Sequence, residues 1–317
     1  MTTSIRLALD WTPNTNHTGF YVALAQGWYE AAGLDVQIST PEDDRYHTTP
    51  AKRVVQGTAD LAITPSESVI SYQTNGVPLV AVAAVLARDA SAIATLKQNG
   101  LDRPQHLDGK VYASYGARFE DDIVRQMIRN DGGRGQFVSY KPDRLDIWHT
   151  LLTNEADATW IFLPWEGAEA AIRDIPLHTF TLDEYEIPYG YSPVLTAMRP
   201  WADSHADALH RFLAATSDGF RLAVEQPEEA ARLLAETAQH PTLADRDFVE
   251  QSQLLASDYY LNGGRWGYMR RDVWNTFVNW LIRHDFIINR DGDKVQQLNV
   301  DTLFTNQFLE GTPAPAH

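Results

Sequence analysis

Residues 10–23 read DWTPNTNHTGFYVA and lie between a predicted strand and a predicted helix. The preceding residues 5–9, IRLAL, have the apolar alternation of a strand, and residues 18–31 have the apolar spacing of a helix. Together with a second apolar strand at residues 34–39, they form a strand-helix-strand unit of the parallel α/β type. Ligands of such sheets bind beyond the carboxyl ends of the strands, so the stretch predicts a binding loop.

The residues of this loop allow two interpretations. Turn chemistry alone would explain it, because proline fixes a turn and Thr15, Asn16 or Thr18 could cap the helix. In the second interpretation, Trp11 stacks on a flat ligand while the amides of Asn14 and Asn16 bind the polar edge of that ligand.

The alternation of strands and helices continues along the chain and restarts near residue 93. The first series adds helices at 50–56 and 66–73 and strands at 59–63 and 78–86. The second has strands at 110–115, 136–140 and 157–162 and helices at 119–130 and 144–154, followed by a strand at 191–198 and helices within 206–237 and 246–257. We therefore predict two α/β lobes, residues 1–90 with 191–317 and residues 91–190, with hinge crossings near 90 and 190.

Composition excludes several classes of function. The net charge of −16, from 42 acidic and 26 basic residues, disfavours binding to nucleic acid or anionic lipid. The absence of cysteine excludes disulfides, thiolate nucleophiles and cysteine zinc sites. No run reaches the roughly 18 apolar residues of a membrane span. No leader precedes the first strand, so we expect a cytoplasmic location for the chain as written, and a periplasmic or extracellular one if a leader was removed.

Motifs for metal binding and for hydrolysis are missing. The ten histidines are scattered, without HExxH or a pair backed by suitable acids, so we predict no metal site. Ser66 and Ser68 lie in TPSESV, which lacks the G-x-S-x-G nucleophile elbow, and we interpret Ser66 as a helix cap. We assign no catalytic residue and no cofactor.

Two glycine-rich segments, NDGGRGQ at 130–136 and LNGGRWG at 261–267, lack phosphate-loop spacing and are interpreted as a helix end and a turn. By contrast, YASYGARFEDD at 112–122 ends a strand in a small-residue bend and opens a helix. The backbone N–H groups around Gly116, together with Arg118, could hold an anion or carboxylate. An ordinary strand-to-helix turn is the alternative.

The segment 157–171, DATWIFLPWEGAEAA, places Glu166 beside an indole where a strand ends and a helix begins. An acid at a helix N-terminus is stabilising by itself. A carboxylate there could also form two hydrogen bonds with a nitrogen heterocycle that carries an exocyclic amine. Residues 187–195, IPYGYSPVL, place Tyr189 and Tyr191 near the second crossing.

Four segments occur in an order that resembles one superfamily: LALDWTPNTNHTGFYVALAQGWYEAAGLDVQI, GTADLAITPSESVISY, DATWIFLPWEG and YGYSPVL. The chain is similar to the NMT1/SsuA-type substrate-binding superfamily, in the branch of thiamine-pyrimidine synthases and formyl-aminopyrimidine-binding proteins. The resemblance covers residues 5 to about 200. It implies a type II periplasmic-binding-protein-like fold, in which two α/β lobes close over a small molecule in a cleft.

The resemblance also implies ligand-binding positions. The loop, the acid of WEG and the tyrosines near the second crossing face the ligand in the binding-protein branch. Carried over to this chain, these positions are Trp11, Asn14, Asn16, Glu166, Tyr189 and Tyr191. Glu67 and Ser68 lie in the equivalent of another cleft loop.

The synthase branch builds the pyrimidine from pyridoxal phosphate and a histidine of its own chain. It needs a lysine and, four residues later, that histidine. The resemblance places Thr64 and Ser68 of this chain at those two positions. The chain also lacks the cysteine-rich motif of that branch. Threonine cannot form an imine and serine cannot donate an imidazole, so we expect that reaction to be impossible here.

The sequence thus predicts a non-catalytic protein that binds a thiamine pyrimidine precursor, or a similar flat heterocycle, between its lobes for uptake or salvage. An ABC permease would be its partner if the chain is exported. One alternative is a cytosolic enzyme of thiamine pyrimidine biosynthesis, for which Gly116 and Arg118 could hold a phosphate. The other is a binding protein for sulfonates or other small anions, which the acid at position 166 disfavours.

Overall fold

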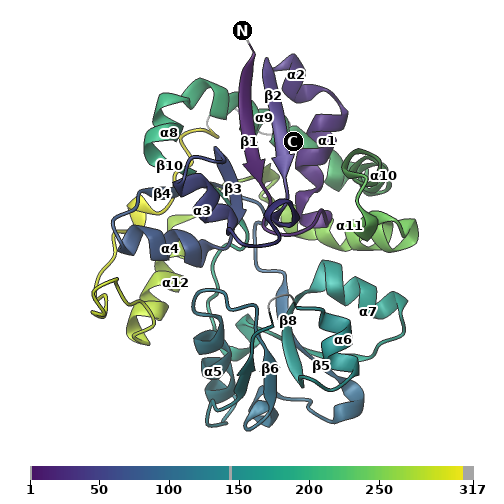
Figure 1. The fold of residues 1–317 in the computed structure, drawn as a ribbon, viewed down its shortest axis with the longest axis vertical. Coiled ribbons are helices and arrows are strands. Elements are labelled where there is room, and N and C mark those ends of the chain that lie inside the picture. Colours follow the sequence, from purple (N-terminus) through teal and green to yellow (C-terminus); the bar gives the residue numbers. More distant parts are fainter. Residues whose placement is uncertain (1, 143–144, 310–317) are drawn as a thin grey trace. The chain divides into compact units, whose positions relative to one another are not determined.

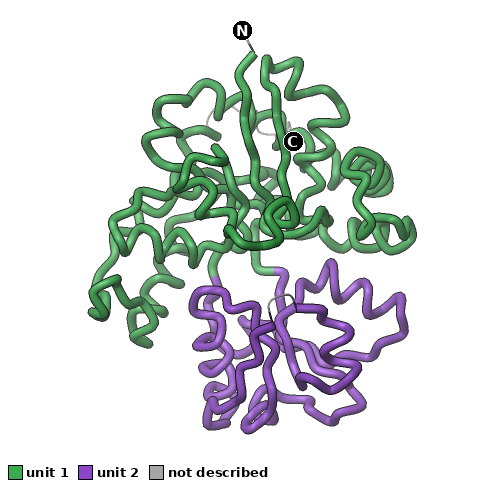
Figure 2. Tube along the Cα trace, in the orientation of Figure 1, with its two compact units in different colours: residues 1–89, 190–317 green, residues 90–189 purple. Residues whose placement is uncertain are grey.

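The chain divides into two compact units in the computed structural model, which describes residues 2–142 and 145–309. Unit 1 combines residues 1–89 with residues 190–317, and unit 2 is the continuous segment 90–189 (Figure 2). Each unit contains one five-stranded sheet with helices (Figure 1), so the predicted α/β class is confirmed for both.

Unit 1 is built on a mixed sheet with the strand order β2-β1-β3-β10-β4. Its strands are β1 (Thr3–Ala8), β2 (Leu34–Ser39), β3 (Leu61–Thr64), β4 (Leu79–Ala84) and β10 (Val194–Met198). Strand β1 pairs in parallel with β2 and β3, whereas β10 runs antiparallel to both β3 and β4. All six residues of β4, LVAVAA, are buried, as expected for a strand covered on both faces.

Nine α-helices of unit 1 are described: α1 (Thr18–Ala25), α2 (Trp28–Ala31), α3 (Pro50–Val55), α4 (Ser66–Thr74), α8 (Arg199–Ser204), α9 (Ala206–Glu225), α10 (Pro227–Ala238), α11 (Arg246–Tyr260) and α12 (Arg271–Arg283). Short 3-10 helices lie at Thr15–His17, Pro41–Asp44, Pro241–Leu243 and Val300–Thr302. The turn predicted at LNGGRWG is confirmed, because it joins β11 (Leu261–Asn262) to β12 (Arg265–Trp266) in a hairpin.

The core of unit 1 contains the crossing of α1 with α9. A Cβ atom on Gly219 would lie 2.0 Å from the carbonyl oxygen of Gly19, so the two helices approach closely only because both residues are glycine. Beside this crossing, the ring of Phe20 meets that of Phe220 edge-on at 5.4 Å, and Phe220 stacks on Trp266 at 4.8 Å.

The single helix predicted at residues 18–31 is wrong. Gly27 has a φ of 67°, a left-handed conformation that ends α1 before α2 begins. The predicted end at residue 31 is confirmed, because α2 ends at Ala31 and the N–H of Gly33 bonds to the carbonyl oxygen of Glu30 at 2.8 Å. None of the described helices is both long and apolar enough to cross a membrane.

Unit 2 contains a second mixed sheet with the order β7-β6-β8-β5-β9. Its strands are β5 (Ser91–Leu96), β6 (Val111–Ala113), β7 (Val138–Tyr140), β8 (Ala158–Phe162) and β9 (Leu177–Thr181), and its α-helices are α5 (Glu120–Asn130), α6 (Ile147–Leu152) and α7 (Ala168–Ile172). Strand β6 is parallel to β7 and β8, and β5 is antiparallel to β8 and β9. A π-helical turn occupies Leu163–Gly167, and 3-10 helices lie at Lys97–Asn99, Pro104–Leu107 and Asp183–Tyr185.

Two strands of unit 2 were not predicted. Strand β9, LHTFT, mixes polar with apolar side chains and lies at the sheet edge, and β5, SAIATL, is rich in small residues. The helix predicted at 144–154 is observed as α6, whose N-cap Asp146 accepts a hydrogen bond from the N–H of His149. The start of that prediction, residue 144, lies outside the described residues.

Candidate ligand site

Topology brings three predicted site segments to one edge of the unit 1 sheet. Strands β1 and β3 are parallel neighbours, with Ala8 opposite Ala62, so the loop after β1 and the turn after β3 leave the same edge. Strand β10 enters the sheet there, because Val194 pairs with Thr64. The predicted residues on this edge are Trp11, Asn14, Asn16, Glu67, Ser68 and Tyr191.

The loop after β1 is held by its own side chains. The amide of Asn14 donates from Nδ2 to the carbonyl oxygen of Thr12, and its Oδ1 accepts from the N–H of Asn16. The N–H of Asn14 donates to Nδ1 of the fully buried His17 at 3.3 Å, so the imidazole proton is on Nε2 and faces Asp10 Oδ1 at 2.8 Å. These bonds fix the course of the backbone through the loop.

The cap predicted at Thr15, Asn16 or Thr18 is wrong. Asn14 caps the 3-10 helix Thr15–His17, and α1 follows without a side-chain cap. A ligand-binding role for Asn14 stays a prediction, and its amide already has a structural one.

Helix α11 stabilises the same loop through buried hydrogen bonds. The hydroxyl of Tyr260 donates to the carbonyl oxygen of Thr15 at 2.6 Å, and Thr15 Oγ1 lies 2.8 Å from Ser252 Oγ. The hydroxyl of Thr18 donates to Gln253 Oε1 at 2.6 Å. Because these partners lie about 240 residues away in sequence, no local pattern could reveal this network.

Trp11 is partly buried at the start of the loop. Its ring lies 5.4 Å from that of Tyr46, with the two planes tilted by 54°. This centroid separation is within the range of favourable aromatic pairs, so Tyr46 helps to orient the indole.

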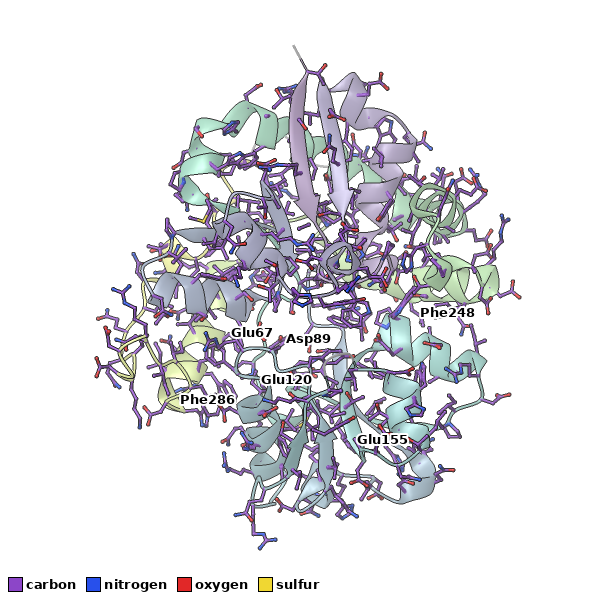
Figure 3. All side chains as sticks on the ribbon, in the orientation of Figure 1. Glu67, Asp89, Glu120, Glu155, Phe248 and Phe286 are labelled. Atoms are coloured by element: carbon purple, nitrogen blue, oxygen red, sulfur yellow. The ribbon has the colours of Figure 1, made fainter. Side chains whose placement is uncertain are left out.

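The turn after β3 carries a buried acid. Glu67 is 3% exposed in the first turn of α4, where the helix dipole favours a negative charge (Figure 3), and Ser66 Oγ donates to its Oε2 at 3.3 Å. The predicted capping role of Ser66 is wrong, because Pro65 occupies the N-cap position. Ser68 is partly buried, and its N–H donates to the carbonyl oxygen of Pro65.

Tyr191 lies in the core of unit 1. It is 2% exposed, its hydroxyl accepts from the N–H of Arg270 at 2.9 Å, and its ring lies 6.3 Å from that of Trp274. These contacts give it a structural role at the start of α12, and its assignment to a ligand stays a prediction.

The remaining predicted residues belong to unit 2. Strands β6 and β8 are parallel neighbours, with Tyr112 opposite Ala158, so the loops 114–119 and 163–167 leave the same sheet edge. This register brings Gly116 and Arg118 to the edge that also carries Glu166.

Glu166 lies in the π-helical turn and is partly buried. Its Oε2 accepts from the N–H of Phe162 at 2.8 Å. Burial raises the pKa of this carboxyl to about 7, against the lowering effect of the hydrogen bond from Phe162 and with a smaller contribution from the charge of Glu169. In the same unit the rings of Trp160 and Tyr189 lie 5.4 Å apart. Unit 2 thus combines aromatic rings with an acid that titrates near neutral pH.

The loop 114–119 does hold a carboxylate, and it is the chain's own. Glu120 Oε1 accepts from the N–H of Tyr115 at 3.0 Å and Oε2 from the N–H of Ala117 at 2.9 Å. The N–H of Gly116 donates to Ser114 Oγ, and Arg118 is exposed. The anion predicted for this turn is therefore supplied internally, and a ligand role for Gly116 and Arg118 stays a prediction.

Sequence reasoning missed Tyr115, Glu120 and the pair of Asp10 with His17. The signal for Glu120 was present, because an acid three residues after the bend at Ala117 has capping-box spacing. Among residues 2–142 and 145–309, no group of three or more histidines and acids could hold a metal ion.

The family model described as NMT1/THI5 like matches residues 14–230. The chain belongs to this family. The matched range includes every predicted site residue except Trp11. The resemblance that the loop, the WEG segment and the YGYSPVL segment indicated is therefore confirmed.

Curated relatives agree with this family, and solved structures have a similar fold. A formylaminopyrimidine-binding protein of Halalkalibacterium halodurans is 26% identical over 290 residues, 90% of this chain and 86% of the relative. A 4-amino-5-hydroxymethyl-2-methylpyrimidine phosphate synthase of Legionella pneumophila is 20% identical over 98% of this chain and 93% of its own. The periplasmic aliphatic sulphonate binding protein SsuA of Escherichia coli has the same fold, with a TM-score of 0.67 at 15% identity over 98% of this chain and all of that one.

Proposed function

We propose that this family member binds an aminopyrimidine-type ligand, such as a thiamine pyrimidine precursor, and that it acts by binding rather than by catalysis. The observation that carries the proposal is Glu166, a partly buried carboxyl with a pKa of about 7 at the end of β8. The aromatic pair of Trp160 and Tyr189 lies in the same unit.

The edge of an aminopyrimidine matches such a carboxyl. The ring nitrogen accepts a hydrogen bond while the exocyclic amine donates one. A protonated Glu166 would donate its O–H to the nitrogen and accept from the amine. If the proton moves to the ring nitrogen, the resulting ion pair keeps both hydrogen bonds. In either form the pair holds one proton, and a carboxyl with a pKa of about 7 carries that proton in about half of the molecules at neutral pH.

The family resemblance adds Trp11, Asn16 and Glu67 as proposed ligand-binding residues. Trp11, partly buried and oriented by Tyr46, is suited to stacking on a heterocycle. Asn14 and Tyr191 would act through the structure, since their polar groups already bond to neighbouring backbone.

Two further observations support binding over synthesis. The Halalkalibacterium halodurans relative is named for binding formylaminopyrimidine. The Legionella pneumophila relative is a synthase, but this chain has Thr64 and Ser68 where the family resemblance places lysine and histidine. Neither side chain can form an imine or donate an imidazole.

The proposal includes delivery of the ligand to a membrane permease. It draws on the Escherichia coli neighbour, which is a periplasmic binding protein of the same fold. Cell fractionation followed by co-purification with candidate permease components would test this part separately from ligand binding.

Isothermal titration with 4-amino-5-hydroxymethyl-2-methylpyrimidine tests the ligand class. We expect the parent protein to bind it, and Glu166→Ala to weaken binding by about 30-fold or more, because a charge-assisted pair is worth about 2 kcal/mol or more. Glu169→Ala is the matched control, since Glu169 is one turn away in an ion pair with Arg173. Trp11→Ala should weaken binding by about tenfold. Equal affinities of Glu166→Ala and the parent would refute the proposal.

A further inference from the structure

A buried acid fills the strand-to-helix turn of unit 2. Glu120, labelled in Figure 3, is 4% exposed at the first position of α5. Its carboxyl group accepts three hydrogen bonds, from the hydroxyl of Tyr112 at 2.9 Å and from the backbone N–H groups of Tyr115 and Ala117. We call the turn of residues 114–119 with these donors the Glu120 cradle.

The cradle binds the ionised form of the acid. All three partners donate, and two of them share Oε1, so a proton on that oxygen would displace one of them. Burial raises the pKa of Glu120 above its ordinary value, and the hydrogen bonds from Ala117, Tyr112 and Tyr115 offset only part of that rise. Phe119, directly before Glu120, has a φ of 66°, a left-handed backbone that side chains rarely adopt. This strained backbone conformation lies in the turn that directs the Glu120 carboxylate back to its three hydrogen-bond donors.

An external anion would need the same donors. Phosphate and sulfonate oxygens accept hydrogen bonds from backbone N–H groups at turns where helices begin. Helix α5, with eleven residues, begins at such a turn, and its dipole favours an anion there. Here those N–H groups already bind a carboxylate. The first turn of α5 also carries Asp121 and Asp122, but these pair with Lys141 at 2.9 Å and Arg125 at 3.2 Å. Glu120 accepts from a hydroxyl and two N–H groups instead, so its charge is the one that an added anion would meet. Arg118 is the cation of the loop, and it is exposed.

We propose that Glu120 is a built-in anion that makes this sheet edge select ligands without an anionic group over phosphorylated or sulfonated ones. The proposal rests on the proposed function for the identity of the ligand. It deepens that function by assigning to one residue the discrimination between an aminopyrimidine and its phosphate ester. Specificity then comes from repulsion of the wrong ligand as well as from attraction of the right one.

The same hydrogen bonds would also be explained if Glu120 acted only as a clamp, that is, if it held the loop in place without any effect on specificity. The two roles differ in what happens when the carboxylate is removed. A clamp leaves only a weaker loop, whereas a built-in anion leaves a cradle that an added anion can fill. The first test therefore uses inorganic phosphate and needs no knowledge of the ligand.

Glu120→Ala empties the cradle, and Asp122→Ala is its matched control. Asp122 is in the same helical turn with a half-exposed side chain, paired with Arg125 at 3.2 Å. Phosphate should raise the melting temperature of Glu120→Ala, because a bound ligand stabilises the folded state. The phosphate concentration that gives half of this increase should be at least about tenfold lower for Glu120→Ala than for the control or the parent. Equal responses of the three proteins would overturn the proposal, and so would strong phosphate binding by the parent.

Glu120→Gln provides a second, independent readout if the alanine variant does not fold. It keeps the size of the side chain and removes the charge. The parent should prefer 4-amino-5-hydroxymethyl-2-methylpyrimidine over its phosphate ester by about 100-fold, and Glu120→Gln should reduce this ratio by about tenfold. An unchanged ratio in a folded variant would overturn the proposal. If the parent binds neither compound, the proposed function fails, while the phosphate response of Glu120→Ala still decides the role of Glu120.

Discussion

Replacing Glu166 with glutamine should stabilise the protein in alkaline solution and do so much less in mild acid. The pKa of this carboxyl rises from an ordinary 4.5 to about 7 in the folded chain, chiefly through burial. The folded state therefore holds the proton more tightly than the unfolded state. The stability associated with the protonated group is complete below pH 4.5 and is lost as the pH rises through about 7.

The size of the effect follows from the same values. Each pH unit of difference corresponds to about 1.4 kcal/mol, so the change from 4.5 to about 7 corresponds to about 3 kcal/mol. Solvent screening of a partly exposed group reduces this figure. Glutamine mimics the protonated acid and can keep the hydrogen bond from Phe162. The stability advantage of Glu166→Gln should thus grow by about 1–2.5 kcal/mol between pH 5 and pH 8.5.

Urea unfolding followed by tryptophan fluorescence measures this difference at each pH. Parent and variant are compared at the same pH, so titration of the other acids cancels. Glu169→Gln serves as the control, since Glu169 pairs with Arg173 and its charge makes only a smaller contribution to the pKa of Glu166. An advantage of Glu166→Gln that stays the same at pH 5 and pH 8.5 would refute the reasoning.

Three further predictions concern binding and packing. Affinity for the aminopyrimidine should fall about tenfold for each pH unit above about 7, because the complex must take up a proton; calorimetry from pH 6 to 8.5 measures this, and a flat profile would contradict it. Tyr260→Phe should cost about 1–2 kcal/mol in urea unfolding, since it removes the donor to Thr15, whereas Tyr259→Phe, which keeps the ring under Arg88, should cost about 0.5 or less. Gly219→Ala should cost about 1–3 kcal/mol through its clash with α1, and a wild-type melting temperature would contradict that geometry.

Local patterns were sufficient to predict the α/β class and the loops in which the candidate residues lie. A loop after β1 or β8 can be read from the sequence because the strand before it and the helix after it have different apolar periods. Once two strands are parallel neighbours, their following loops must leave the same edge. The observed pairing of β1 with β3 and of β6 with β8 brings Trp11 to the same edge as Glu67, and Gly116 to the same edge as Glu166.

Competition between structural and ligand-binding use of the same side chain could not be predicted. The presence of an asparagine in the sequence does not show whether its amide caps a helix or binds a ligand. For Asn14 the outcome depends on the position of His17. The turn around Gly116 contains backbone N–H groups that bind the carboxylate of Glu120, and this arrangement depends on a left-handed residue at Phe119 that no pattern of apolar residues indicates. The clamp from α11 depends on packing over most of the chain length.

The position of β10 has a consequence for how the chain is made. The sheet of unit 1 places β10 between β3 and β4, yet all of unit 2 is translated between β4 and β10. At about 5–20 residues per second, the roughly 110 intervening residues take about 5–25 seconds to emerge from the ribosome. Unit 2 is continuous and can fold in that interval. Strands β3 and β4 meanwhile wait with unpaired edges for a partner not yet synthesised, so the nascent chain is most exposed to aggregation, and most dependent on chaperones, just before residue 194 appears.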